Sequence, residues 1–280
     1  MLELWLILIM FPPFIWALAN FYDKVLISRL FSNVYSYLFW TSIISLSIAL
    51  IVIPILGFYE FFSIFHTIVL FIVGYLYLAS FIFYAKALEI EESSKVGSLF
   101  VLVTLFLIFF EFMFLGVALT FLQYIASIII IVSSLIMLNS TQITSILSIF
   151  KLNRVFVYMI INSVIIAGYF IVLRVFLDMY EFLSVLFWIF LGSFVFLISM
   201  LFNKSMRIEI IQSHKKIISR KIFIFVLIVV NIFVLLPDII YNYVISIAPS
   251  VALVSVVANV QYIFLFIFGI LFTKFLPSIF

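Results

Sequence analysis

The sequence contains no cysteine, and it has few charged residues of either sign. The absence of cysteine excludes disulfide bonds, thiolate catalysis and cysteine-ligated metals in this chain. Charged residues make up 9% of the sequence and hydrophobic residues 69%, whereas soluble domains average about 25% charged and about 45–50% apolar residues. So few polar side chains cannot cover the surface of a water-soluble protein of 280 residues. A lipid bilayer removes that requirement, because it surrounds the protein with an apolar solvent.

Motifs for cofactors and catalysis are also missing. The GxxxxGK[ST] motif, whose backbone binds nucleotide phosphates, does not occur. His66 and His214 are the two histidines, and neither has a second ligand at a metal-binding spacing. The clustered His, Asp or Glu residues that an integral-membrane enzyme needs are absent as well. We therefore expect no catalysis, no cofactor or metal, and no nucleic-acid partner.

Long apolar runs, separated by short polar connections, dominate the chain. A helix needs about 20 predominantly apolar residues to cross a bilayer, and its backbone groups must be paired within the helix. The predicted fold is therefore an all-α polytopic protein of the cell membrane, with a prokaryotic inner membrane as the expected location. Glu3 stands where a signal peptide has its basic region, so we expect the first helix to be retained. The nine predicted spans are 4–25, 34–56, 64–86, 96–115, 118–138, 155–175, 182–202, 222–246 and 250–272.

An internal repeat is indicated by two segments that share a pattern. Residues 84–106 read YAKALEIEESSKVGSLFVLVTLF, and residues 241–263 read YNYVISIAPSVALVSVVANVQYI. In both, a helix ends with Tyr and small residues, a tight turn follows, and Ser opens the next helix. Repeats of this kind are common in secondary transporters and are often inverted. The ungapped alignment pairs Tyr84 with Tyr241, Ser93 with Ser250, and Ser98 with Ser255.

The connection at 139–154, rich in Ser, Thr and Asn, divides the chain into two predicted five-helix repeats, residues 1–140 and residues 141–280. The second half shows only four spans, so we expect a tenth helix to be missing after Phe280. Lys and Arg are concentrated in the connections after odd-numbered spans, including a long polar loop at 203–221, while Arg174 lies on the other side. The positive-inside rule then places the N-terminus outside the cell.

Several segments resemble EamA-type members of the drug/metabolite transporter superfamily. Residues 84–106 resemble the junction between that family's third and fourth helices, and FLGVALTFLQYIASIIIIVSSLIML at 114–138 resembles the passage from its fourth to its fifth. WALANFYDKVL at 16–26 is similar to the first helix, and residues 241–272 to the eighth-to-ninth junction. The resemblance implies a ten-helix membrane transporter with cytoplasmic termini, an orientation opposite to the one that the charges indicate.

Polar side chains inside the predicted spans are the candidate functional residues, because they are costly in a membrane unless they have a role. Trp16, Asn20 and Lys24 lie on one helical stripe, where Lys24 could instead extend to the interface with Asp23 neutralising it. Asn231, Asp238 and Asn242 share a second stripe, and Pro237 directly precedes the acid. Asn and Gln can also simply join helices. The predicted substrate pathway comprises Trp16, Asn20, Tyr84, Asp238, Asn242, Asn259 and Gln261, with Asp238 as the candidate for proton coupling.

The function predicted from these features is secondary transport of small metabolites or drug-like organic solutes by alternating access between two repeats. Two alternatives stay open: a lipid or lipid-linked-sugar flippase of the same architecture, and a structural membrane subunit without transport. The expected partners are a small-molecule substrate and membrane lipids. The protein is expected to be a monomer or a homodimer. Glu111, near a tight turn, is expected to be an interfacial carboxylate.

Overall fold

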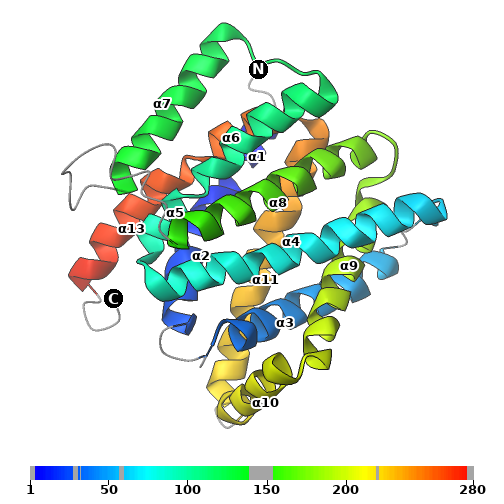
Figure 1. Ribbon diagram of the computed structural model, residues 1–280, viewed down its shortest axis with the longest axis vertical. Coiled ribbons are helices and arrows are strands. Elements are labelled where there is room, and N and C mark those ends of the chain that lie inside the picture. The colour runs from blue at the N-terminus through cyan, green and yellow to red at the C-terminus, as the bar shows by residue number, and fades with distance from the viewer. Residues whose placement is uncertain are drawn as a thin grey trace.

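The computed structural model describes residues 4–27, 31, 33–56, 60–138, 154–218 and 221–275. These residues form helices, with no strand among them. The long helices run between the lower left and the upper right of the view in Figure 1. The helices are α1 Leu4–Leu8, α2 Phe11–Val25, α3 Val34–Ile55, α4 Ile64–Ile90, α5 Ser93–Ser98, α6 Val101–Phe110, the π-helix η2 Glu111–Leu115, α7 Phe121–Leu138, α8 Arg154–Leu177, α9 Phe182–Phe202, α10 Lys204–Ile218, α11 Lys221–Ile247, α12 Val251–Ala258 and α13 Gln261–Phe275.

The membrane-spanning character is confirmed. Within the described residues, seven helical segments are long and apolar enough to cross a bilayer, and all seven fall on predicted spans. The other two predicted spans, 118–138 and 222–246, fall on α7 and α11, and their crossing stays a prediction. The predicted boundary between residues 140 and 141 and the chain end at Phe280 lie outside the described residues.

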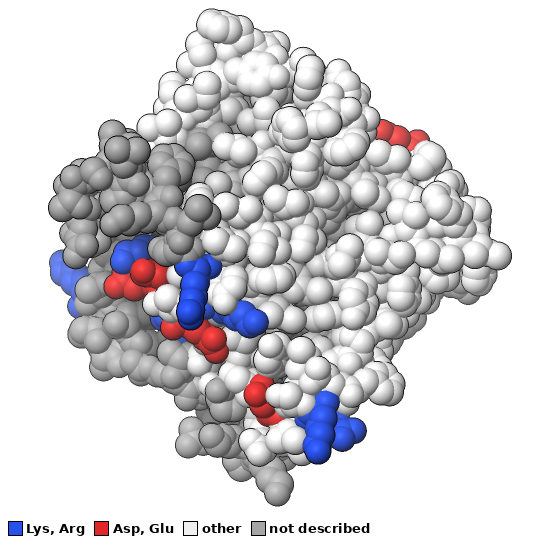
Figure 2. Space-filling model, in the orientation of Figure 1, with Lys and Arg blue, Asp and Glu red and all other residues white. Residues whose placement is uncertain are grey.

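The surface has the character of a lipid-facing protein. Along α4, Ile68, Ile72 and Leu76 follow one another at a spacing of four and are 51%, 50% and 46% exposed. Such a stripe is favourable against hydrocarbon. Figure 2 shows charged side chains at the lower left and at the bottom of the visible face, acidic ones at the upper right, and a broad uncharged band between them.

The predicted polar loop at 203–221 is wrong for most of its length, because residues 204–218 form α10. Asn203 Oδ1 accepts hydrogen bonds from the backbone N–H groups of Ser205 and Met206, which caps the start of the helix. One face of α10 packs on α3, where Trp40 Nε1 donates to Ser213 Oγ at 3.1 Å. Lys204 and Arg207 are exposed on its other side. These two charges therefore lie on the exposed face of a helix.

Two spans pack backbone against backbone where α4 crosses α9. A Cβ atom at Gly74 would overlap the backbone carbonyl of Ile189, and one at Gly192 would overlap the carbonyl of Phe71. Ser193 Oγ also donates to the carbonyl oxygen of Gly74 at 2.8 Å. Small residues at such crossings let two backbones pack directly, which drives helix association in a membrane. The α4–α9 pair thus packs closely, and α4 is also one of the helices that enclose the cavity described below.

Replacing Gly192 by Ala is expected to destabilise the protein by about 1–3 kcal/mol, because the added methyl group forces α4 and α9 apart. The matched control is Gly168→Ala in α8, where an added Cβ meets nothing within 4 Å. This control is expected to be neutral or slightly stabilising, since Ala favours helix more than Gly does. Thermal unfolding in detergent micelles measures both. Equal melting temperatures for the two variants would contradict the tight crossing.

Candidate functional site

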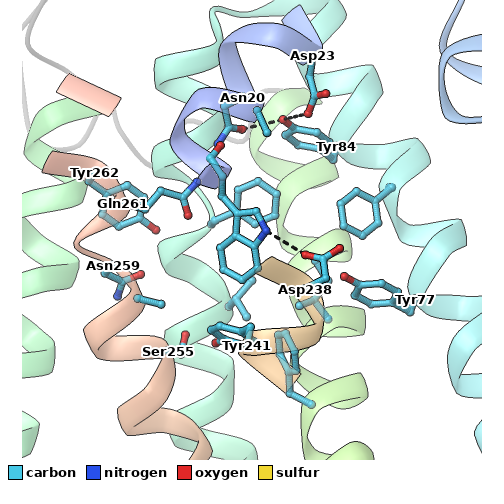
Figure 3. A pocket seen from close by; sticks show the side chains of 18 residues that line it. Asn20, Asp23, Tyr77, Tyr84, Asp238, Tyr241, Ser255, Asn259, Gln261 and Tyr262 are labelled. Carbon is cyan, nitrogen blue, oxygen red and sulfur yellow. Dashed lines mark hydrogen bonds between the residues drawn. The ribbon is translucent and has the colours of Figure 1, made fainter. Parts of the chain in front are cut away.

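A cavity of about 190 Å³ lies among α2, α4, α6, α8, α11, α12 and α13. Figure 3 shows the 18 side chains that line it. The helices on either side of residue 140 both contribute, so the cavity lies between the two halves of the chain. Six of the seven predicted pathway residues are among the lining residues, although their contact with a substrate stays a prediction. They are Trp16, Asn20, Tyr84, Asp238, Asn259 and Gln261.

Asp238 is joined to the first half of the chain by a direct hydrogen bond. Trp16 Nε1 on α2 donates to Asp238 Oδ1 on α11 at 2.9 Å. The indole also packs on Tyr241, with 5.0 Å between ring centroids. Pro237 lies within α11 immediately before the acid, where it leaves a carbonyl one turn earlier without its helical donor. A dashed line at Asp238 marks this hydrogen bond in Figure 3.

A second polar group lies one to two turns further along α2. Tyr84 Oη on α4 donates to Asn20 Oδ1 at 2.7 Å and lies 3.2 Å from Asp23 Oδ2. Asn20 Nδ2 in turn donates to the carbonyl of Trp16 at 2.9 Å. Tyr84, Asn20 and Asp23 therefore form one connected network on the cavity wall, as Figure 3 shows.

Asp23 is a lining residue that the sequence analysis missed. It was assigned to neutralising Lys24, but Lys24 Nζ turns away and donates to the carbonyls of Leu88 and Glu91 at the end of α4, at 2.5 and 2.8 Å. The signal for Asp23 was present in the sequence. It lies seven residues after Trp16 and three after Asn20, on the same helical face.

Asn242, the seventh predicted pathway residue, is not among the cavity-lining residues. Its Oδ1 accepts a hydrogen bond from Tyr169 Oη at 3.3 Å within the packed interior. Asn231 is likewise engaged elsewhere, since Ser45 Oγ on α3 donates to Asn231 Oδ1 at 2.9 Å. The predicted stripe on α11 is divided because the helix passes α3, α2 and α8 in turn. Of its three residues, only Asp238 reaches the cavity.

The sequence model of the EamA-like transporter family matches residues 3–139. The match confirms the predicted resemblance and indicates a membrane transporter of the drug/metabolite type. A comparison with curated proteins gave no match. Half of the cavity wall, including Trp16 and Tyr84, therefore comes from the EamA-like part of the chain.

Polar contacts join this EamA-like part to α12. Thr104 Oγ1 on α6 and Ser255 Oγ on α12 are 2.6 Å apart, and Asn259 Nδ2 donates to Thr104 Oγ1 at 3.1 Å. Both Ser255 and Asn259 also line the cavity. Asn259 therefore holds two helices together and presents an amide at the cavity wall at the same time.

Glu111 is buried, not interfacial as expected, with 2% of its surface exposed. Its carboxylate accepts hydrogen bonds from Ser250 Oγ at 2.7 Å and from the backbone N–H groups of Val251 at 2.7 Å and Ala252 at 2.9 Å. These N–H groups belong to the first turn of α12, which has no helical acceptor for them. The charge also lies at the positive end of the α12 dipole. Glu111, at the start of η2, thus fixes where α12 begins.

Replacing Glu111 by Ala is expected to destabilise the protein by about 2–4 kcal/mol, because a buried hydroxyl and two N–H groups lose a charged acceptor. Glu111→Gln, which keeps one carbonyl oxygen, should lose less. Glu181→Ala is the control, since this exposed residue at the start of α9 makes no capping hydrogen bond through its side chain. Denaturant unfolding in micelles measures the three variants. A Glu111→Ala protein as stable as the control would disprove the capping role.

Proposed function

We propose that this protein is a secondary transporter of small metabolites or drug-like organic solutes, working by alternating access between repeats of residues 1–140 and 141–280. The observation that carries the proposal is the cavity between the halves, with the Trp16–Asp238 hydrogen bond across it. Transporters built from two repeats bind their substrates at such an interface, near the middle of the membrane.

The first support for two repeats is a contact at the end of α4. Lys24, in the last turn of α2, donates to the carbonyls of Leu88 and Glu91. These carbonyls belong to the last turn of α4 and the residue beyond it, which lack helical donors. A cation also lies favourably at the negative end of the helix dipole. The end of the first span is thereby fixed to the end of the third.

The second half contains the same contact. Arg174, in the last turn of α8, donates through Nη1 to the carbonyls of Ile245 at 2.6 Å and Ala248 at 3.2 Å, at the end of α11. The ungapped alignment of residues 84–106 with residues 241–263 places these carbonyl groups at equivalent positions. It pairs Leu88 with Ile245 and Glu91 with Ala248.

Inversion follows if all nine predicted spans cross the membrane. Lys24 then ends the first span and Arg174 ends the sixth, so the two contacts lie on opposite sides of the bilayer. Each side of the cavity would carry one cation-capped pair of helix ends. This arrangement supports inverted repeats that can open alternately to either side.

The size of the cavity favours solutes over lipids. About 190 Å³ slightly exceeds the cavity of about 150 Å³ that holds benzene in an engineered protein core. A lipid with its acyl chains does not fit into such a space, so a flippase mechanism has less support. The presence of a lined cavity also favours transport over a purely structural role.

Alternating access predicts that one cavity position reacts from both sides of the membrane. Because the chain has no cysteine, a single Ala258→Cys substitution at the cavity wall can be probed with a membrane-impermeant thiol reagent. Labelling is expected from either side in oriented vesicles. Ala167→Cys is the matched control, because Ala167 is fully buried and does not line the cavity. Labelling of Ala258→Cys from one side alone would rule out alternating access.

Proton coupling through Asp238 predicts that Asp238→Asn abolishes the pH dependence of transport. The groups facing Asp238 are Trp16 on α2, Tyr77 on α4 and Tyr169 on α8, and none of them is a base that could replace a carboxylate. Proteoliposome uptake of radiolabelled amino acids, amines and sugars under an imposed proton gradient measures the effect. We expect gradient-driven uptake to fall at least tenfold, with Asp178→Asn unchanged. Retained pH dependence would remove Asp238 from the coupling mechanism.

A further inference from the structure

Two carboxylates, those of Asp23 and Asp238, are among the described side chains of the cavity wall. No Lys, Arg or His is among these described lining residues. The side-chain salt bridges of the described residues, Lys95–Glu91 and Arg174–Asp178, involve neither acid. Both cavity carboxylates are thus without an ion-pair partner in the described part of the chain.

The nearest cation in the sequence is already occupied. Lys24 follows Asp23 directly, but its ammonium group is bound to the carbonyls at the end of α4. The groups that contact the two carboxylates are neutral: the Trp16 indole donates to Asp238, and the hydroxyls of Tyr37 and Tyr84 lie within hydrogen-bonding distance of Asp23. An ionised carboxylate away from water is costly unless an opposite charge compensates it. No opposite charge among the described residues compensates these two carboxylates, which leaves a proton or a cationic ligand to do so.

Aromatic rings surround the acidic groups. Trp16 packs on Tyr241 with 5.0 Å between ring centroids, and Tyr241 packs on Phe170 at the same distance. Tyr77 and Phe81 on α4 also line the cavity. The faces of aromatic rings attract cations electrostatically, and quaternary ammonium groups are bound in proteins by cages of such rings. Carboxylates and ring faces together repel anions and attract cations.

We infer that the cavity binds a small organic cation, namely a primary to quaternary ammonium ion that carries an apolar group. The inference rests on the proposed transport function and names its substrate class. The ammonium group pairs with Asp238, Asp23 adds negative potential about two turns of α2 away, and the apolar group contacts the aromatic wall. The cavity volume of about 190 Å³ limits the ligand to roughly the size of one aromatic ring with a substituted ammonium group. A cation and a proton compete for the same carboxylates, which connects the ligand to proton coupling.

The test uses radiolabelled phenyltrimethylammonium and the purified full-length chain in detergent, with binding measured by equilibrium dialysis. Unlabelled choline is expected to displace the probe. The neutral isostere of choline, 3,3-dimethyl-1-butanol, is expected not to displace the probe at the same concentration. The anion benzenesulfonate is expected not to displace the probe either. This comparison uses the unmodified protein, so it does not depend on the folding of any variant. No saturable binding of the probe, or equal displacement by choline and the neutral isostere, would overturn the inference.

Variants locate the bound cation. Asp238→Asn and Asp23→Asn are each expected to weaken probe binding at least tenfold, and Trp16→Phe should weaken it less because a ring remains. Asp178→Asn is the matched control, with the same chemical change on a side chain that is 58% exposed and outside the cavity. Binding that is unchanged in both cavity variants would place the cation elsewhere and overturn the assignment. Two-sided labelling of Ala258→Cys tests transport separately, so failure of the cation assignment and failure of the transport function give different results.

Discussion

Inside a bilayer, each backbone N–H or C=O group that a helix leaves unpaired must be hydrogen-bonded by another part of the protein. Charged side chains meet this requirement here at three buried or partly buried helix ends. Lys24 serves the end of α4, Arg174 the end of α11, and Glu111 the start of α12. In each case the sign of the charge matches the helix dipole. The tight turn between α11 and α12 is hydrogen-bonded on both sides. Arg174 binds a carbonyl at the end of α11, and Glu111 binds an N–H group at the start of α12.

This use of charge determines the electrostatics of the cavity. Lys24 and Arg174 are bound to carbonyl groups, and no basic residue is among the described residues that line the cavity beside Asp23 and Asp238. The donors that reach these acids are neutral side chains, which orient the carboxylates without cancelling their charge. The hydrogen-bonding requirement of the helix ends therefore also accounts for the acidic lining of the cavity.

The sequence was sufficient to predict the helical fold, because a span of about 20 apolar residues has only one stable conformation in lipid. It was also sufficient to predict that Trp16, Asn20 and Asp238 share one site, because each is a polar residue well inside a span. The sequence did not predict the role of residues whose function depends on which other residue they contact in the fold. Asp23 and Lys24 are adjacent in sequence but face different partners, and Asn242 shares a face with Asp238 but meets Tyr169 instead of the cavity. The charges of residues 204–218 predict a loop, whereas this segment forms the helix α10.

In the proposed repeat, some equivalent positions of the two halves have side chains of different chemical character. Tyr84 and Tyr241 occupy equivalent positions, and both line the cavity. One turn before them, at another pair of equivalent positions, stand Phe81 on α4 and Asp238 on α11. At this pair of positions one half thus contributes an acid and the other an aromatic ring. Within the proposed transporter, such an asymmetric lining distinguishes the charged end of a ligand from its apolar end.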